Sequence, residues 1–126
     1  NTMAARVGIN VDGYVLPVPK AKLAAYKKMA KKVGGIYKEL GAIEIVEAVE
    51  DDVKPGKLTS FPQAVKRKAG EVVVFSWIIY KTKTERNRIN RLVMKDPRLA
   101  DMMDPKSMPF DGKRMFWGGF KPIVWE

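Results

Sequence analysis

The sequence contains neither cysteine nor histidine. Without cysteine, the chain has no thiol nucleophile, disulfide, thiolate zinc site or iron–sulfur cluster. Without histidine, it lacks the Ser-His-Asp triad, histidine-ligated metal sites and the proximal histidine of a haem. Any proton transfer must use Asp, Glu, Lys, Tyr or the substrate itself. We expect no cofactor and no bound metal, and whether the chain is an enzyme stays open.

Long apolar runs are also absent, and the N-terminus has no basic segment followed by an apolar stretch. No run approaches the roughly 20 residues that span a bilayer, and no secretory signal is visible. We therefore expect a cytoplasmic protein with no membrane partner. The 126 residues, 46% of them hydrophobic, fit one domain with a real core. We predict this domain over residues 11–126, after a tail, residues 1–10, that is disordered or expression-derived.

The chain is basic, with a formal net charge of +10. Such a charge suits a nucleic-acid partner, but it also suits an ordinary solvated surface. Six lysines of residues 20–38 occupy the side of a predicted helix that faces away from its apolar stripe, which is typical of a surface helix. No RNA-binding sequence motif is recognisable. RNA therefore remains an alternative partner.

Hydrophobic periodicity predicts the order strand, helix, strand, hairpin arm, strand, helix, strand. The strongest signal is residues 20–40, where apolar residues recur every three or four positions up to a helix stop at Gly41. Thr82 and Glu85 form a capping box that starts the second helix. The remaining predictions are strands at 12–18, closed by prolines, at 42–49 and at 115–124, with a hairpin at 64–81 that turns at 69–70.

This order predicts an α+β fold: a ferredoxin-like antiparallel sheet with helices on one face. The run EVVVFSWIIY is apolar on both faces of its strand. Two helices cover one face of a four-stranded sheet, so the other face must be buried against something else. A second copy of the same sheet is the simplest partner. We therefore expect a homodimer formed through the sheet face.

Five segments together resemble the YbaA-like family, a bacterial family of unknown function: VDGYVLPVP, GAIEIVEAVEDDV, EVVVFSWIIY, DPR and, above all, SMPFDGKRMFWGGF. The resemblance implies a dimeric α+β barrel, in which ferredoxin-like monomers pair their sheets. It transfers no catalytic residues. The wider superfamily includes cofactor-free monooxygenases that act on activated aromatic compounds.

Glu47 shares one face of its predicted strand with apolar residues at 43, 45 and 49. A buried carboxylate has a raised pKa unless it is paired, which would make Glu47 a candidate catalytic acid or base. The alternative is a structural ion pair across the dimer.

Asp111, Lys113 and Arg114 lie at a predicted Asp-Gly turn. In one interpretation they bind an anionic ligand, and Arg114 donates two hydrogen bonds to it. In the other they stabilise the turn through local hydrogen bonds, and Met108 and Phe110 pack into the core beneath it. The predicted strands also carry an aromatic set with one polar neighbour, which forms either core or a pocket for a flat ligand. From this set we take Tyr14, Ser76, Trp77 and Trp117 as further ligand-binding candidates.

We carry three functional hypotheses from these residues. The first is a homodimer that binds a small molecule, aromatic or anionic. The second is a cofactor-free monooxygenase or isomerase that acts on an activated aromatic substrate. The third is an RNA-binding protein.

Overall fold

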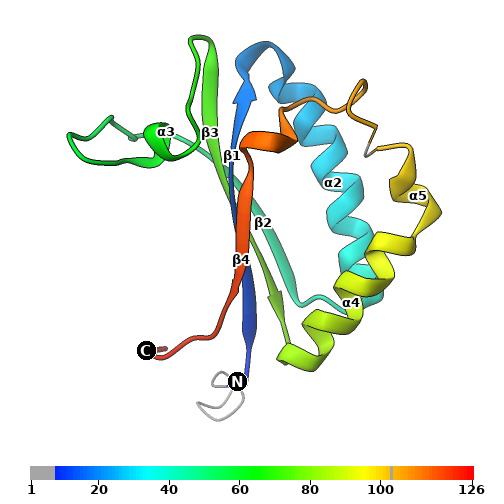
Figure 1. The fold of residues 1–126 in the computed structure, drawn as a ribbon. Helices are drawn as coiled ribbons and strands as arrows, with labels where there is room; N and C mark the ends of the chain where they lie inside the picture. Colours follow the sequence, from blue (N-terminus) through cyan, green and yellow to red (C-terminus); the bar gives the residue numbers. More distant parts are fainter. Residues whose placement is uncertain (1–7, 103) are drawn as a thin grey trace.

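The computed structural model describes residues 8–102 and 104–126. Figure 1 shows a sheet seen nearly edge-on, with the helices α2, α4 and α5 on one side. The elements in chain order are β1 (Asn10–Pro19), a 3-10 turn (Lys20–Lys22), α2 (Leu23–Leu40), β2 (Glu44–Val49), α3 (Phe61–Ala64), β3 (Glu71–Tyr80), α4 (Lys83–Lys95), α5 (Pro97–Ala100), a second 3-10 turn (Gly112–Arg114) and β4 (Phe116–Phe120).

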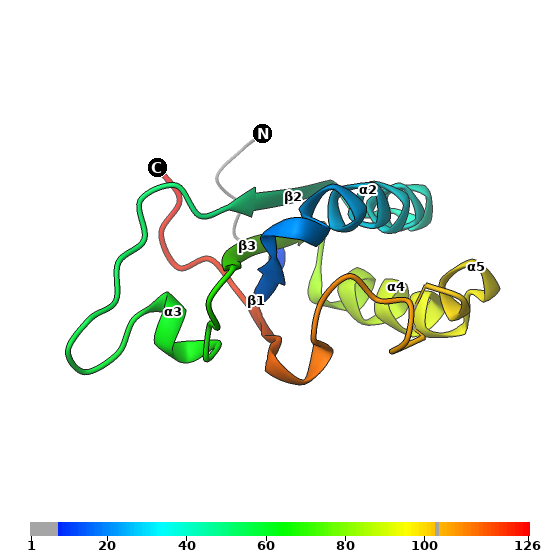
Figure 2. The ribbon, with the colours of Figure 1, turned by 90° about the horizontal axis from the view of Figure 1, so that it is seen from above.

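The four strands form one sheet in the order β2-β3-β1-β4, and every neighbouring pair is antiparallel. With two helices over one face, this is the ferredoxin-like arrangement, and the predicted fold class is confirmed. Helix α2 lies along β2, whereas α4 contacts β1 and β3 (Figure 2). On the helix side of the sheet, α2 is therefore the helix that covers the edge strand β2.

Local signals in the sequence explain where the helices begin and end. Gly41 has a φ of 123° and ends α2, a left-handed conformation that glycine adopts without strain. The Thr82 side chain accepts a hydrogen bond from the backbone N–H of Glu85 and caps α4. Two apolar clusters fill the space between helices and sheet: one surrounds Tyr80 and Ile89, the other Leu16 and Val18.

Strand β1 is longer than predicted, because Pro17 and Pro19 do not end it. Both prolines stay in register with β3, opposite Val73 and Glu71. Strand β4 pairs with β1 over residues 11–15. Both prolines lie beyond this range, in a part of β1 with which β4 does not pair. A proline on a free edge leaves no ladder hydrogen bond unmade.

The predicted hairpin arm is wrong in its first half. The strand predicted at 64–68 does not form: residue 64 ends the short helix α3 (Phe61–Ala64), and a turn follows at 65–66. The Ser60 hydroxyl accepts a hydrogen bond from the N–H of Gln63, and Pro62 occupies the first turn. This cap and proline favour a helix start, which the hydrophobic pattern did not reveal. The arm, residues 50–70, therefore reaches β3 through an irregular turn.

The two ends of the domain also differ from the predicted bounds. Residues 1–7 of the expected tail lie outside the described residues, whereas Asn10 already belongs to β1. The last strand ends at Phe120 instead of residue 124, where its pairing with β1 stops opposite Val11. The segment after β4, residues 121–126, leaves the sheet.

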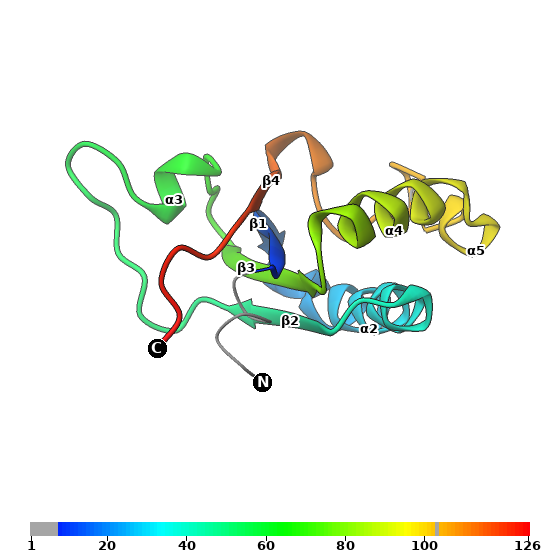
Figure 3. The same cartoon turned by 90° about the horizontal axis from the view of Figure 1, so that it is seen from below.

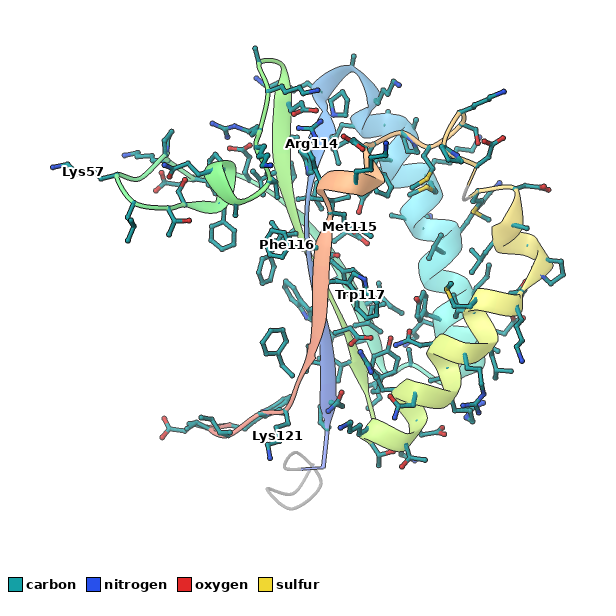
Figure 4. All side chains as sticks on the ribbon, in the orientation of Figure 1. Lys57, Arg114, Met115, Phe116, Trp117 and Lys121 are labelled. Atoms are coloured by element: carbon teal, nitrogen blue, oxygen red, sulfur yellow. The ribbon has the colours of Figure 1, made fainter. Side chains whose placement is uncertain are left out.

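The face of the sheet opposite the helices is open along β4. Figures 1 and 3 show the arm and the C-terminal segment projecting on this side. Phe75, Phe116 and Phe120 are exposed there, and Figure 4 shows Phe116 and Trp117 on opposite sides of β4. Among the described residues, no helix is both long and apolar enough to cross a bilayer. The cytoplasmic location stays a prediction.

Candidate functional site

One row of residues crosses all four strands on the helix side of the sheet. Trp117 of β4 pairs with Tyr14 of β1, Tyr14 pairs with Ser76 of β3, and Ser76 pairs with Glu47 of β2. We call these four residues the cross-sheet row. It runs between the two apolar clusters of the core. All four residues were candidates from the sequence, and the strand register brings them into one line.

At the β2 end of this row, Glu47 meets helix α2. The Tyr26 hydroxyl donates a 2.6 Å hydrogen bond to Oε1 of Glu47. Apolar surroundings raise the pKa of the Glu47 carboxyl, and the hydrogen bond from Tyr26 offsets part of that rise. No ion pair to Glu47 exists among the described residues, so a neutral phenol is its partner in the monomer. The predicted ion pair across a dimer remains untested.

Glu47 and Tyr26 line a groove that lies between α2 and the edge strand β2 and has a volume of about 770 Å³. Its apolar walls include Leu23, Ala30 and Ile45. Two helix residues in its lining, Ala30 and Gly34, are too small to fill it, and Gly34 lies close to Ile45 of β2. Glu47 keeps an exposed side towards this space. A hydrogen-bonded carboxylate in an apolar groove can orient a ligand or accept a proton from it.

At the other end of the row, two aromatic rings stack, and the outer one, Trp117, is half-exposed. Tyr14 stacks on Trp117, with ring centroids 5.7 Å apart and an interplanar angle of 17°. The guanidinium of Arg86 lies 5.7 Å from the centre of the Trp117 ring. Burial is the largest reason why the pKa of the Tyr14 hydroxyl is raised. Tyr14 is therefore a neutral phenol in the core at all ordinary pH values.

Arg86 is held in place by a buried carboxylate. Asp12 has no exposed surface, and its Oδ1 accepts a 2.9 Å hydrogen bond from Nε of Arg86. Its Oδ2 accepts hydrogen bonds from Nδ2 of Asn90, at 2.9 Å, and from the hydroxyl of Tyr80, at 3.1 Å. All of these partners satisfy a charge that would otherwise be costly to bury. The network joins β1 and β3 to α4.

Asp111, Lys113 and Arg114 lie away from the cross-sheet row, at the opposite end of β4 from the C-terminal segment. Arg114 donates two hydrogen bonds to Glu71, of 2.7 and 2.6 Å, and a third to Asp111, of 3.0 Å. The Asp111 side chain also accepts a bond from the N–H of Lys113. These hydrogen bonds match the predicted turn staple, but the three residues also line a groove of about 500 Å³, so their ligand-binding role stays a prediction. Lys113 is exposed.

Phe110, the apolar side chain expected beneath this turn, contacts a residue that lines the groove. Phe110 packs edge-on against Tyr26, with ring centroids 5.7 Å apart. The segment SMPFDGKRM therefore positions the phenol that binds Glu47. Trp77, the remaining candidate, lies on the open face of the sheet instead, in a shallow apolar groove of about 560 Å³ that Phe75 and Phe120 also line.

Sequence reasoning missed Tyr26, Asp12 and Arg86. Tyr26 fits the apolar stripe of α2, so its spacing indicates core alone. Asp12 alternates with Val11 and Gly13 at the start of β1, and a charged residue there is usual at a strand end. A signal for Asp12 existed, because it occupies the same face as Tyr14 and Leu16.

The sequence comparisons agree with this structure. Residues 10–112 match the family described as "Protein of unknown function (DUF1428)". The chain belongs to this family. It is 49% identical to the uncharacterized protein YbaA of Escherichia coli K12 over 116 aligned residues. The alignment covers 92% of this chain and 97% of that protein. The YbaA protein of Shigella flexneri is similar to the same extent. The predicted YbaA-like resemblance is confirmed.

The solved structures similar to this DUF1428 chain share its fold at low sequence identity. A variant of SnoaB, a cofactor-independent oxygenase from Streptomyces nogalater, aligns with a TM-score of 0.60 and 10% identity over 94% of this chain and 96% of that one. A dimeric ferredoxin-like protein from an uncultured marine organism aligns with a TM-score of 0.57 and 12% identity over 94% and 91%. At these identities, the comparison concerns the fold alone.

Proposed function

We propose that this DUF1428 protein is a homodimer in which each subunit binds a small molecule in the groove between α2 and β2. The observation that carries the proposal is the Tyr26–Glu47 pair in the wall of a 770 Å³ groove. Ligand sites are concave and mostly apolar, with a few polar groups that fix orientation. The groove combines an apolar lining with one hydrogen-bonded carboxylate and fits that description.

The homodimer rests on the open face of the sheet. Phe120 is 66% exposed on this face, and both flanking segments carry apolar side chains into solvent: Leu58 of the arm is 94% exposed and Ile123 of the C-terminal segment 89%. A face with apolar residues between two apolar projections suits a symmetric partner, because each projection then reaches across the two-fold axis. The similar marine protein is itself dimeric.

Filling the groove tests the binding proposal. Gly34 lies in the groove, and a Cβ there would meet Ile45 at 3.5 Å, an ordinary contact. Gly34→Phe should fill the space and abolish binding of the uncharged probe N-phenyl-1-naphthylamine, measured by its fluorescence. Gly35→Phe is the matched control, because a Cβ at Gly35 meets no atom within 4 Å. Equal binding by both variants would contradict the proposal.

A second function is favoured by the raised pKa of Glu47. A carboxylate of raised pKa is a better base for a substrate hydroxyl or carbon acid near neutral pH. Glu47 would take the proton and become a neutral carboxylic acid, leaving the substrate as its anion. That step begins both an isomerisation and an oxidation in which dioxygen takes electrons from the anion. Glu47→Gln should keep probe binding but abolish any turnover, and unchanged turnover would exclude Glu47 as the base.

A further inference from the structure

Three lysines of helix α2 line the side of the groove that faces away from the sheet: Lys27, Lys31 and Lys38. Their spacing of four and seven residues puts them on one side of the helix. The Nζ of Lys38 donates a 2.9 Å hydrogen bond to the carbonyl of Ile43 and so spans from helix to sheet. This bond ties down one of the three cations.

Lys27 and Lys31 are exposed and are not tied down. No hydrogen bond or ion pair engages either side chain in the part of the chain that the structure describes. The two carboxylates in the groove do not neutralise them, since Glu47 is bonded to Tyr26 and neither it nor Glu44 forms a salt bridge there. Two unpaired ammonium groups therefore stand beside apolar walls.

The geometry points to an amphipathic anion as the ligand of this groove: a small molecule with an apolar body and one carboxylate, sulfonate or phosphate group. Its apolar body would lie between Ala30 and Ile45 and its anionic group would meet Lys27 and Lys31. A polar group on the body, such as a hydroxyl, could reach Glu47. This inference rests on the proposed binding function and names its ligand class.

The arrangement also argues against a neutral ligand of the same shape. An anion placed between the two lysines gains from both charges, whereas a neutral molecule leaves them as they are in the free protein. The lysines lie at the rim in contact with water, so each contributes a modest, salt-dependent amount. We therefore expect the groove to discriminate between an anion and a neutral molecule more strongly than between two apolar bodies of different shape.

Two fluorescent probes separate the charge from the apolar body. 8-Anilinonaphthalene-1-sulfonate carries an anionic group that N-phenyl-1-naphthylamine lacks, and their aromatic bodies are alike. The double variant Lys27→Gln/Lys31→Gln should weaken binding of the sulfonate about tenfold, because two rim ion pairs are lost, and leave the uncharged probe unchanged. The affinity of the unmodified protein for the sulfonate should also fall as the salt concentration is raised.

The matched control is Lys28→Gln/Lys32→Gln, which removes the same charge from α2 outside the groove. If both double variants weaken the sulfonate equally, or neither does, the lysine pair does not select an anion and the inference is overturned. If the unmodified protein binds neither probe, or Gly34→Phe leaves both probes bound, the groove itself is not the site and the proposed function fails. Retained secondary structure by circular dichroism confirms that each variant is folded.

Discussion

Tyr26 on α2 and Glu47 on β2 are joined by a 2.6 Å hydrogen bond that connects the helix layer to the edge strand of the sheet. The Tyr26 ring is in turn packed by Phe110 from the distinctive segment before β4. Three segments far apart in the sequence therefore set the position of one carboxylate. Any ligand in the groove meets a polar group whose orientation is fixed before binding.

The Tyr26–Glu47 bond should contribute about 1 kcal/mol to the free energy of unfolding, the usual net value of a hydrogen bond. A double-mutant cycle of Tyr26→Phe and Glu47→Ala, measured by urea unfolding, isolates this coupling. Because the pKa of Glu47 is raised in the folded state, its presence should make the protein less stable as pH rises above the ordinary value of 4.5. Glu47→Gln should flatten that part of the pH profile. A coupling of zero would show that the bond is not formed in solution.

Arg114→Ala should destabilise the protein by about 3 kcal/mol, because it leaves the carboxylate of Glu71 without its partner. The side chains of the pair are only 13% and 9% exposed, so water replaces the lost bonds poorly. Lys113→Ala is the matched control one residue away, and its exposed side chain should matter by less than about 0.5 kcal/mol. Similar losses for the two variants would mean that Arg114 does not act as a staple.

Acid should weaken the same staple. The hydrogen bonds from Arg114 are the largest reason why the pKa of Glu71 lies below its ordinary value. A carboxylate with a depressed folded pKa contributes full stability above pH 4.5 and loses it as the pH falls through the folded value. Urea unfolding between pH 7 and 3 should therefore show a steeper acid limb for the unmodified protein than for Glu71→Gln. Parallel curves would contradict this.

Two neighbouring glycines of β4 should differ in their tolerance of alanine. A Cβ on Gly119 would lie 3.0 Å from the guanidinium of Arg86 and 3.3 Å from Asp12, whereas one on Gly118 would meet only the Phe120 ring, at 3.8 Å. Gly119→Ala should lower the melting temperature by several degrees, the effect of about 1 kcal/mol, through displacement of the buried ion pair. Gly118→Ala should change it little. A larger fall in melting temperature for Gly118→Ala than for Gly119→Ala would contradict this prediction.

Charge on the open face should separate the proposed dimer. Phe75→Glu/Phe120→Glu should give monomers in sedimentation velocity, because burying two carboxylates against a second sheet is unfavourable. Met94→Glu, on a more exposed residue of α4, should leave the dimer intact. A native monomer whose open face binds single-stranded RNA through Phe75 and Phe120, with affinity that falls as salt rises, would instead favour the RNA alternative.

The sequence predicted the fold well because its periodic signals are strong. The apolar stripe of α2, its stop at Gly41 and the Thr82 cap all lie where the structure has them. The errors concern β1 and the arm. Whether Pro17 ends a strand depends on how far its neighbour β4 extends, and that length is a tertiary property. Likewise, the helix α3 depends on a cap and on packing of Phe61 against Phe75, which local hydrophobicity does not encode.

The sequence pointed to four residues of the cross-sheet row but not to their arrangement. Alternation put Tyr14, Ser76, Glu47 and Trp117 each on a face of its strand, yet only the register of all three strand pairs aligns them. Arg114 lies in an unusual segment, but the sequence does not show that Glu71, 43 residues away, is its ion-pair partner. Tyr26 could not be separated from core residues, because its position on α2 is the same for both roles.

Strand β1 has one further consequence. It precedes the other three strands in the sequence and lies between β3 and β4, so one of its edges pairs with β3 and the other must await residues 116–120. Until β4 has been synthesised, Val11 to Val15 present unpaired backbone groups on that second edge. The nascent chain therefore depends on β4 to protect this edge of β1 from other chains.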